Sequence, residues 1–507
     1  MGTKAIKFVY KIMEKNESLD IGGLTFLIPP WKHQLAALSK AKDLPEYGLL
    51  FEVGTGKTST AINIIRSKMN SEGRFLKTLI LGPPIIIKNW VKELGMHSKI
   101  EPRQIMPLYG SGAKRLKEFT EATKADPKRV VITNYETLSM SELYSALVLW
   151  KPEIVIYDES HMLKDPRAAR SKLALTFSEN ARYRYILTGT PVLNSPLDLF
   201  HQFRLLDNGQ TFGHNFFLFR ARFFVDKNAN MPKQKYFPNW QIAPGALGKI
   251  NSMISAKTMR ALKKDCLDLP PLVRETRYVS MTVEQSRLYR EMKQELVTYL
   301  GDKACVATMA LTKALRLMQL ASGYIKVTDG EEIALEETPK QLVLKQLLQE
   351  LTPNHKVIVW ATWKQNYEQI AEVCEELGIA YTEIHGGVSG TEKFNNMDTF
   401  NDDPKCRVLI GHPGSGGVGV NLIQASYCIF YSRNFSLGHS LQAEARCHRG
   451  GSEIHEKITR IDLVTENTID EAIVKRLLAK KEVSDALLGD EDSIMTKQLL
   501  MELKDEI

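Results

Sequence analysis

Fifty residues into the chain, an apolar run breaks into a glycine-rich loop that contains a lysine followed by a hydroxyl residue. The loop has the sequence Phe51-Glu52-Val53-Gly54-Thr55-Gly56-Lys57-Thr58. Glycines let the backbone N–H groups of Gly54–Gly56 turn toward a polyphosphate, and a following helix adds a favourable dipole. We therefore predict an ATP site in which Lys57 reaches the terminal phosphates and Thr58 holds Mg²⁺. The strict pattern has a glycine where this chain has Phe51, and a plain tight turn is the alternative interpretation.

Two adjacent carboxylates, Asp158 and Glu159, follow another apolar run of residues 154–157 about a hundred residues later. At the carboxyl end of a strand, they would lie where α/β folds place their ligands. Asp158 is suited to orient Mg²⁺, and Glu159 to position and deprotonate an attacking water. An isolated Asp-Glu pair is more often a solvated turn. The phosphate loop upstream favours the catalytic interpretation.

Two further segments combine small and hydroxyl residues. The first follows a strand-like run and consists of Thr188, Gly189 and Thr190, which we expect to couple the γ-phosphate site to the second half of the chain. The second spans residues 415–422, where small residues let a backbone approach its ligand closely. We assign Gly417 of this segment to ATP binding.

Arg446 and Arg449 lie three residues apart, so on a helix they share one face. Two guanidinium groups on one face are able to meet a γ-phosphate and stabilise charge in the transition state. The alternative is a pair of ordinary surface arginines. Because a phosphate loop is present, we interpret them as arginine fingers supplied by the same chain.

The pattern of apolar runs predicts the elements that must position these residues. Short strands alternate with helical stretches from residue 31 to about 200, and a second alternation begins near residue 338, which indicates parallel sheets flanked by helices. Only the first half carries a phosphate loop, so we expect nucleotide to be clamped between two α/β lobes. The predicted divisions are a β appendage (1–30), lobe 1 (31–280) with an aromatic, helical insertion (about 200–262), a helical linker (281–335), lobe 2 (336–480) and a C-terminal brace or tail (481–507).

Composition narrows the class of protein. A chain of 507 residues is too long for one hydrophobic core, and a net charge of +8 with a pI near 8.9 is compatible with nucleic acid. Six cysteines without a C-x-x-C pair disfavour zinc and favour a reducing compartment. The N-terminus lacks the apolar stretch of a signal peptide, and no run is long enough to span a membrane. We expect a cytoplasmic protein without a membrane partner.

Taken in order, these motifs resemble those of superfamily 2 helicases, and more narrowly the Swi/Snf-type remodelling ATPases with their bacterial and phage relatives. The resemblance covers residues 31–478. It also rests on residues of the linker pattern that is peculiar to this branch, namely Arg260, Lys263, Lys264, Asp265, Leu269, Pro270 and Pro271. It implies an α/β fold with two RecA-like lobes, helical insertions and a small N-terminal β appendage.

The resemblance also implies roles for single residues. Gln34 would read the adenine. Strand contacts are implied for six residues in three motifs, namely Lys88, Trp90, Thr133, Asn134, His385 and Gly386. The chain departs from the family pattern at Ser160 and after Gly450, and it lacks the large eukaryotic targeting domains, which places nucleosome remodelling in doubt.

The main functional hypothesis is an ATP-dependent DNA helicase or translocase that grips the backbone of duplex, forked or branched DNA without reading its sequence. We expect it to act as a monomer in a bacterial or phage-infected host cytosol. A second hypothesis keeps the motor but changes its partner to RNA or an RNA polymerase. A third is an ATP-gated clamp with little turnover. Retention of Lys57, Asp158, Glu159, Arg446 and Arg449 argues against the clamp.

Overall fold

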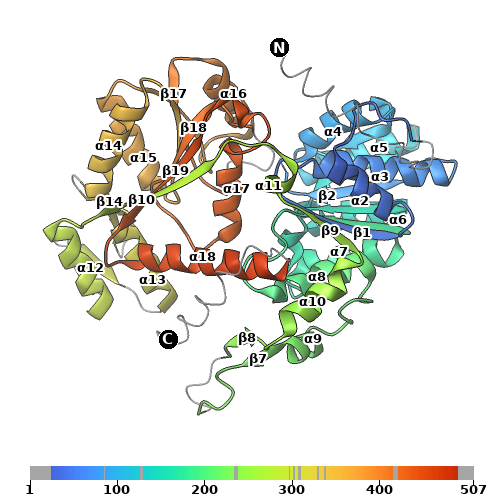
Figure 1. Ribbon diagram of the computed structural model, residues 1–507, viewed down its shortest axis with the longest axis horizontal. Helices are drawn as coiled ribbons and strands as arrows, with labels where there is room; N and C mark the ends of the chain where they lie inside the picture. The colour runs from blue at the N-terminus through green and yellow to red at the C-terminus, as the bar shows by residue number, and fades with distance from the viewer. Residues whose placement is uncertain are drawn as a thin grey trace.

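The computed structural model describes residues 24–84, 86–125, 129–232, 238–295, 297–300, 303–306, 310–327, 330–335, 338–414 and 421–488. The predicted β appendage therefore lies largely outside the described residues, as do Gly417 and the end of the predicted tail. The described chain forms two lobes side by side, each built on a parallel sheet with helices on both faces (Figure 1). This arrangement confirms the predicted fold class.

Seven parallel strands form the sheet of lobe 1, in the order β3-β4-β2-β5-β6-β1-β9. Their bounds are β1 (Glu46–Phe51), β2 (Thr78–Gly82), β3 (Ile105–Pro107), β4 (Val130–Asn134), β5 (Ile154–Asp158), β6 (Tyr183–Leu187) and β9 (Thr258–Ala261). Both faces of the sheet are covered, so a strand is apolar along its whole length. In β2, for example, Leu79 and Leu81 face one core while Ile80 faces the other.

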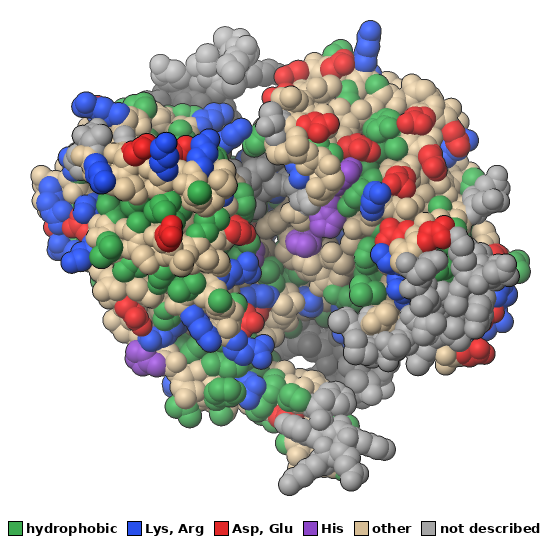
Figure 2. Space-filling view, turned by 180° about the vertical axis from the view of Figure 1, so that it is seen from behind, with side chains coloured by type: hydrophobic (Ala, Val, Ile, Leu, Met, Phe, Trp, Pro, Cys, Tyr) green, Lys and Arg blue, Asp and Glu red, His purple; other side chains and the backbone are tan. Residues whose placement is uncertain are grey.

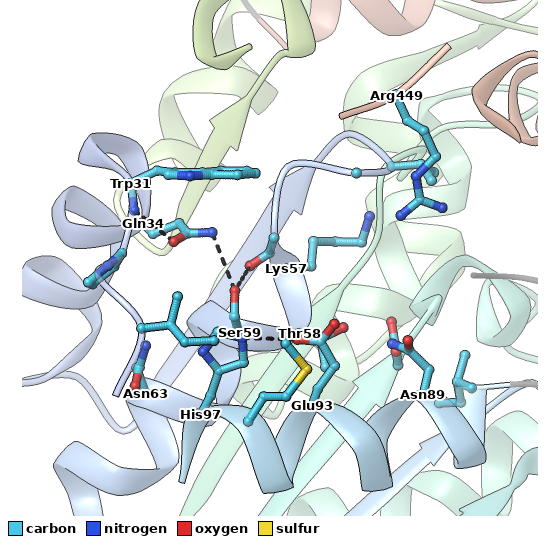
Figure 3. Close-up of a pocket in the computed structure, with 18 of the residues that line it drawn as sticks. Trp31, Gln34, Lys57, Thr58, Ser59, Asn63, Asn89, Glu93, His97 and Arg449 are labelled. Atoms are coloured by element: carbon cyan, nitrogen blue, oxygen red, sulfur yellow. Dashed lines mark hydrogen bonds and ion pairs between the residues drawn. The ribbon is translucent and has the colours of Figure 1, made fainter. Parts of the chain in front are cut away.

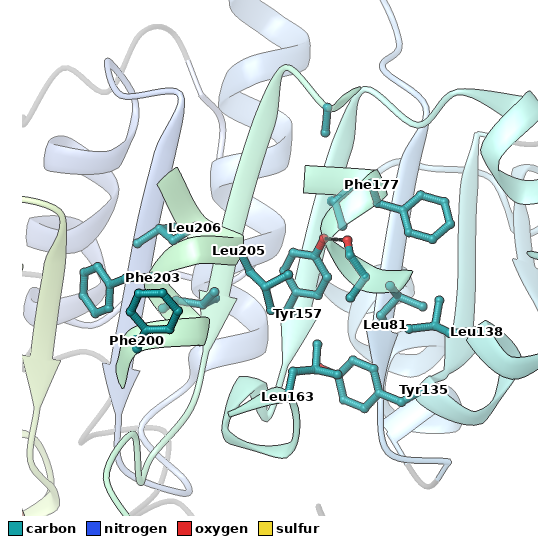
Figure 4. Packing of buried hydrophobic residues seen from close by; sticks show 14 of the residues in the cluster. Leu81, Tyr135, Leu138, Tyr157, Leu163, Phe177, Phe200, Phe203, Leu205 and Leu206 are labelled. Atoms are coloured by element: carbon teal, nitrogen blue, oxygen red, sulfur yellow. Dashed lines mark hydrogen bonds between the residues drawn. The ribbon is translucent and has the colours of Figure 1, made fainter. Parts of the chain in front are cut away.

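Helices cover the two faces of this sheet. One face packs against α2 (Lys32–Ala41), α3 (Lys57–Ser71) and α4 (Ile86–His97). The other packs against α5 (Gly112–Ala125), α6 (Ser141–Trp150), α7 (Ala169–Asn180) and α8 (Leu199–Asp207). Figure 4 shows the second core, where Tyr157 of β5 lies among Leu163, Phe177 and the side chains of α8.

The predicted aromatic insertion begins later than expected, because α8 belongs to the core of lobe 1. Between α8 and β9 the chain forms α9 (Phe216–Phe223), an antiparallel hairpin of β7 (Phe224–Asp226) and β8 (Trp240–Ile242), and α10 (Ala246–Ser255). The hairpin projects away from both lobes (Figure 1). The insertion is thus only partly helical.

Lobe 2 has a six-stranded parallel sheet in the order β10-β19-β18-β15-β17-β16. Its strands are β10 (Leu272–Val279), β15 (Lys356–Trp360), β16 (Ala380–Ile384), β17 (Cys406–Gly411), β18 (Ala425–Phe430) and β19 (Ile458–Thr465). Strand β10 pairs along its whole length with β19. The first strand of lobe 2 therefore begins at Leu272, and not beyond residue 280 as the sequence analysis placed the boundary. A short helix, α11 (Lys263–Cys266), lies in the link between the two sheets.

Helices also cover both faces of the second sheet, with α14 (Pro339–Leu351) and α15 (Lys364–Glu376) on one face and α16 (Gly390–Asp402) and α17 (Leu437–Cys447) on the other. The predicted helical linker contains α12 (Val283–Glu295) and α13 (Ala310–Ala321). It also contains two hairpins, β11 (Val297–Leu300) with β12 (Lys303–Val306) and β13 (Tyr324–Lys326) with β14 (Glu332–Ala334). Helix α18 (Ile469–Leu487) follows β19 and reaches lobe 1 (Figure 1).

The carboxyl ends of the strands carry the predicted site residues. The phosphate loop follows β1, Asp158 ends β5, and Thr188 follows β6. Ligands of open α/β sheets bind at this edge, because loops and helix N-termini converge there. Within the described residues, no helix combines the length and apolar composition that crossing a bilayer requires.

Candidate active site

The phosphate loop turns through two glycines with positive φ angles, 91° at Gly54 and 80° at Gly56. An L side chain rarely adopts these angles, and a Cβ on Gly56 would lie 1.9 Å from Gln34 Nε2. Helix α3 begins at Lys57 directly after this turn. The Lys57 ammonium donates to the carbonyl oxygen of Phe51 at 2.8 Å. The loop thus has the backbone geometry that its glycine spacing predicts.

The structure explains why Phe51 replaces the usual glycine. Phe51 is the last residue of β1, its side chain is fully buried, and its ring meets His33 edge-on at 5.3 Å between centroids. Only its carbonyl oxygen contacts the phosphate loop, through Lys57. A side chain at this position therefore fills the core without entering the loop.

A cavity of about 360 Å³ opens beside the loop (Figure 3). This volume lies within the range of about 300–1,000 Å³ that is usual for small-molecule sites. Its lining combines the phosphate loop with residues of α2, α4, the acidic strand end and lobe 2, including Trp31, Gln34, Lys57, Thr58, Asn63, Glu93, His97, Asp158, Glu159 and Arg449. The structure therefore brings the predicted ATP-site residues of lobe 1 to one cavity, with the exception of Thr55, which is fully buried and donates its hydroxyl to the Glu52 carbonyl at 2.8 Å.

Gln34 lines this cavity from α2, with both ends of its amide engaged by the protein. Its Oε1 accepts from the Trp31 amide at 2.9 Å, and its Nε2 donates to Ser59 Oγ at 3.3 Å. The ring of Trp31 lies beside it at the mouth of the cavity (Figure 3). Adenine recognition by Gln34 stays a prediction.

The carboxylate of Asp158 is oriented by donors from its surroundings. Trp90 Nε1 donates to its Oδ2 at 2.8 Å, and the Glu159 amide donates to its Oδ1 at 2.9 Å. Burial and the neighbouring charge of Glu159 raise the pKa of Asp158. A nearby cation would relieve this cost, and the hydroxyl of Thr58 lines the same cavity. Hydroxyl and carboxylate oxygens suit Mg²⁺, which is usually held by one or two carboxylates together with substrate phosphates.

Glu159 lies on a left-handed turn with φ 51° and is 3% exposed. His161 Nδ1 lies 3.3 Å from its Oε2 and 3.0 Å from Thr188 Oγ1. Burial raises the pKa of Glu159, but the hydrogen bond from His161 and the charges of Lys57 and Arg446 outweigh it and hold the pKa low. Glu159 is therefore ionised and fixed in orientation.

The segment Thr188-Gly189-Thr190 packs against the strand that leads into the phosphate loop. A Cβ on Gly189 would lie 3.0 Å from the Phe51 carbonyl oxygen. The Thr188 hydroxyl accepts from the Thr190 amide at 3.1 Å and bonds to His161, which contacts Glu159. This segment, which follows β6, therefore connects the acidic pair to the start of the phosphate loop.

Lobe 2 contributes both predicted arginines to the site. Arg446 lies in α17, is 2% exposed, and has its pKa lowered to about 9 by burial and by Arg449, against the attraction of Glu159. Arg449 lines the cavity in front of the phosphate loop, where its Cβ would lie 3.3 Å from a Cβ placed on Gly54 (Figure 3). Helix α17 ends at Cys447, so Arg449 lies beyond it and the two arginines do not share one helical face as predicted. Arg449 lies beside the phosphate loop, whereas Arg446 is close to Glu159, and their role as arginine fingers stays a prediction.

Three of the residues assigned to strand contact are buried, and the structure corrects these predictions for their side chains. Trp90 and Thr133 are fully buried, and Asn134 is 5% exposed. The Trp90 indole donates a hydrogen bond to Asp158, and the Thr133 hydroxyl is hydrogen-bonded to that of Thr137. Asn134 accepts a hydrogen bond from Arg115 Nη1 at 2.8 Å. Packing inside lobe 1 leaves none of them able to reach a strand.

The other three lie at the surface. Lys88 is exposed, and its ammonium lies 4.0 Å from the ring centroid of Phe394 on α16 of lobe 2. His385 is half-buried and stacks on Tyr367 at 4.3 Å, and Gly386 beside it is exposed. The strand contacts of these three residues stay predictions.

Sequence reasoning missed several residues of the site. On α4, the cavity-lining residues Asn89, Glu93, Met96 and His97 recur at intervals of three and four, a helical-face signal that was present in the sequence. Trp90 was missed because its motif was assigned to strand contact. Lys263 joins the two lobes, with its amide donating to Glu52 Oε2 at 2.6 Å and its ammonium donating to the His448 carbonyl at 2.7 Å. The residues next to Lys263 in the sequence do not predict a contact with so distant a segment.

Two family models match successive parts of the chain. A family model described as the SNF2-related domain matches residues 13–326, and one described as the helicase conserved C-terminal domain matches residues 339–451. A solved structure entitled "Sulfolobus solfataricus SWI2/SNF2 ATPase core in complex with dsDNA" covers 94% of this chain and 97% of its own, with 21% identity and a TM-score of 0.41.

Curated relatives show the same family at low identity. The chain is 24% identical to chromodomain-helicase-DNA-binding protein 1-like of Danio rerio and to the ATP-dependent DNA helicase DDM1 of Arabidopsis thaliana, covering 87% and 93% of this chain. It spans only 41% and 62% of their lengths. A protein named p41 from Acyrthosiphon pisum secondary endosymbiont phage 1 is 25% identical, with 92% of this chain and 98% of the phage protein covered.

These matches and the composition of the cavity support an ATP-hydrolysing enzyme. The SNF2-related model covers lobe 1 and continues through β10, α12 and α13, and the C-terminal model covers lobe 2 from α14 through α17. The first family model alone covers more than half of the 507 residues. On that ground the chain belongs to the SNF2-related family of helicase-like ATPases.

Proposed function

We propose that this protein is a DNA-dependent ATPase that moves along or remodels DNA without reading its sequence. One observation carries the proposal: the cavity beside the phosphate loop of lobe 1 is completed by Arg449 of lobe 2, with Arg446 directed at the charge of Glu159. A nucleotide in such a cavity contacts both lobes and favours their closed arrangement. Hydrolysis removes the γ-phosphate that the arginines hold, and the lobes then separate.

Each residue has a role that its position supports. Lys57 exchanges the Phe51 carbonyl for the terminal phosphates, while Thr58 and Asp158 hold Mg²⁺. The bound ion supplies charge neutralisation at the phosphate oxygens. Glu159, which is ionised and held by His161, accepts a hydrogen bond from the attacking water. The two guanidinium groups stabilise negative charge in the transition state.

DNA is the partner that the family and the surface support. Lys88 on lobe 1 and His385 with Gly386 on lobe 2 lie at the surface, and Lys88 meets Phe394 across the two lobes. Backbone contacts made from both lobes would be broken and remade as the lobes open and close. Relatives named as a DNA helicase and a helicase-DNA-binding protein favour DNA over RNA. Arg449 of the same chain completes the cavity, which supports action as a monomer, and the phage relative supports a bacterial cytoplasm.

The test is the steady-state ATPase rate without nucleic acid and with single-stranded DNA, blunt duplex, forked duplex or RNA. Glu159→Gln is the blank, because it keeps the shape of the site but removes the carboxylate that holds the water. We expect duplex or forked DNA to raise the wild-type rate strongly. We expect the blank to bind ATP yet hydrolyse it roughly 10²- to 10⁴-fold more slowly.

The outcomes separate the hypotheses. A higher rate with forks than with blunt duplex indicates strand separation, and equal rates indicate translocation along duplex. Stimulation by RNA alone would replace DNA as the partner. A low rate on every substrate would contradict the motor, and ordinary turnover by Glu159→Gln would remove the assigned role of Glu159.

A further inference from the structure

Most aromatic rings of the lobe 1 insertion pack inward. Phe219 and Phe223, four residues apart on α9, are 1% and 2% exposed, and Phe212 packs on Phe219 with 4.8 Å between centroids. Phe216 meets Phe200 of α8 edge-on at 5.4 Å. These rings pack α9 against lobe 1, and all of them except the partly buried Phe216 are withdrawn from the surface.

Two apolar side chains of the same helix point the other way. Phe217 is 66% exposed and Leu218 is 70% exposed. They are adjacent in sequence and lie outside the inward face that Phe219 and Phe223 define. Adjacent exposed side chains of this size are typical of a binding surface, whereas isolated ones need no explanation.

A guanidinium group lies beside this pair. The guanidinium carbon of Arg220 lies 5.3 Å from the ring centroid of Phe217 and 4.0 Å from that of Trp240 on β8. Within the part of the chain that the structure describes, Arg220 Nε is buried without a hydrogen-bond partner. Among residues 208–232 and 238–245, which the structure describes, three are basic (Arg220, Arg222 and Lys227) and one is acidic (Asp226). That carboxylate accepts from the Asn228 and Asn239 amides inside the hairpin.

The surface is placed to meet DNA outside the gap between the lobes. Seen from behind, hydrophobic and basic side chains lie together at the lower end of lobe 1, on the face from which the gap between the lobes is visible (Figure 2). The hairpin extends beyond this end of the lobe (Figure 1). A strand that leaves the gap in that direction would pass α9.

We propose that α9 and the neighbouring strand β8 bind an unpaired DNA strand, with a base stacked on Phe217. The occupant must carry negative charge to match the cations and a flat apolar face to match the ring. Bases in a duplex are covered by their neighbours, so only an unpaired base offers such a face. The inference rests on the proposed function, which it deepens by naming single-stranded DNA as a second ligand of the motor.

The test measures fluorescence anisotropy of labelled oligothymidine, an abasic strand of equal length and a blunt duplex, without ATP. Phe217→Ala is expected to weaken oligothymidine binding about tenfold, from the known worth of one base–aromatic stack, and to leave abasic and duplex binding unchanged. Phe217→Tyr keeps a ring and should bind as the wild type does. Leu149→Ala removes another exposed apolar side chain, 79% exposed on α6, and serves as the matched control.

Equal binding of oligothymidine by Phe217→Ala and the wild type would overturn the inference and leave this face to a protein partner. Equal loss on duplex and oligothymidine would also overturn it, because stacking requires an unpaired base. The proposed function fails separately, if DNA does not stimulate the wild-type ATPase while the Phe217→Ala defect in strand binding is present.

Discussion

Asp158 and Glu159 are neighbours in the chain, yet their surroundings drive their pKa values in opposite directions. Burial beside Glu159 raises the pKa of Asp158, while His161, Lys57 and Arg446 outweigh burial at Glu159 and keep its pKa low. Two carboxylates separated in this way can serve different tasks in one site. The residue that holds Asp158 in place is Trp90, through a buried hydrogen bond of 2.8 Å.

Trp90→Phe tests this contact, because it keeps a ring in the core but removes the indole donor. We expect kcat/KM for Mg-ATP to fall roughly 10- to 100-fold, as is typical when the partner of a metal-binding carboxylate is lost. Loss of a buried hydrogen bond to a charged group should lower the free energy of unfolding by about 1.5–3 kcal/mol. Steady-state kinetics at varied Mg²⁺ and urea unfolding measure the two effects.

Trp150→Phe is the matched control, because Trp150 is a buried tryptophan of lobe 1 that packs on Phe119. It should lose stability without a selective loss of kcat/KM. If Trp90→Phe hydrolysed ATP normally but bound DNA weakly, the strand-contact prediction for Trp90 would be reinstated.

At the scale of elements, the link between the two sheets, which contains helix α11, contacts both halves of the active site. The Lys263 amide donates to Glu52 in the phosphate loop, and its ammonium donates to the His448 carbonyl, one residue before Arg449. The His448 ring lies 3.0 Å from the Pro270 carbonyl oxygen of the same link. The link therefore helps to position the arginine segment relative to the phosphate loop.

Lys263→Met should lower kcat roughly 10- to 100-fold, because small displacements of a transition-state group are costly, with little change in ATP affinity. ATP turnover and equilibrium nucleotide binding separate the two quantities. The neighbouring Lys264→Met is the control and should retain kcat. Normal kcat in Lys263→Met would show that the link does not position Arg449.

The same variant should change how stability depends on pH. Burial lowers the pKa of Lys263 to about 8, against the attraction of Glu52 and Glu444 and together with repulsion from Arg449. Because the folded pKa is depressed, the unfolded chain binds more protons between pH 8 and the ordinary lysine pKa of about 10.4. The wild type should therefore gain stability relative to Lys263→Met across this interval, as urea unfolding at several pH values would show.

At the scale of the whole molecule, α18 ties the two lobes together. Ile473 and Leu477 pack in a cluster with Leu437 of lobe 2, whereas Leu487 at the end of the helix enters the core of lobe 1. Asp485 pairs with Arg260 of β9 at 2.9 Å. Helix α18, which begins at Ile469 and follows the last strand of lobe 2, thus completes the packing of lobe 1.

Leu487→Ala should loosen this attachment. Removing a buried leucine costs about 2–5 kcal/mol. Because the cost falls on the contact between the lobes, we expect calorimetry to show separated unfolding transitions and the ATPase rate to fall. Leu477→Ala is the control, since it removes a leucine of the same helix that packs within lobe 2. A single unshifted transition in Leu487→Ala would mean that α18 does not hold the lobes together.

Features that depend on short stretches of chain could be predicted from the sequence alone. The phosphate loop and the acidic strand end follow from a strand, a turn and a helix whose geometry is local. The predicted shared helical face of Arg446 and Arg449 is wrong, because α17 ends at Cys447. Two alternating patterns with one phosphate loop were enough to predict two lobes and a site between them. The order of the motifs was enough to identify the family.

Which residues of those motifs are buried, and which lobe each segment joins, depends on tertiary packing and could not be predicted from the local sequence. Trp90 and Thr133 stand in motifs assigned to strand contact, but packing against Asp158 and Thr137 places them in the core. Strand β10 crosses to the sheet of lobe 2, and Lys263 meets a carbonyl 185 residues away. Local sequence patterns indicate which faces of an element are apolar. The element that covers each face depends on packing between segments far apart in the chain.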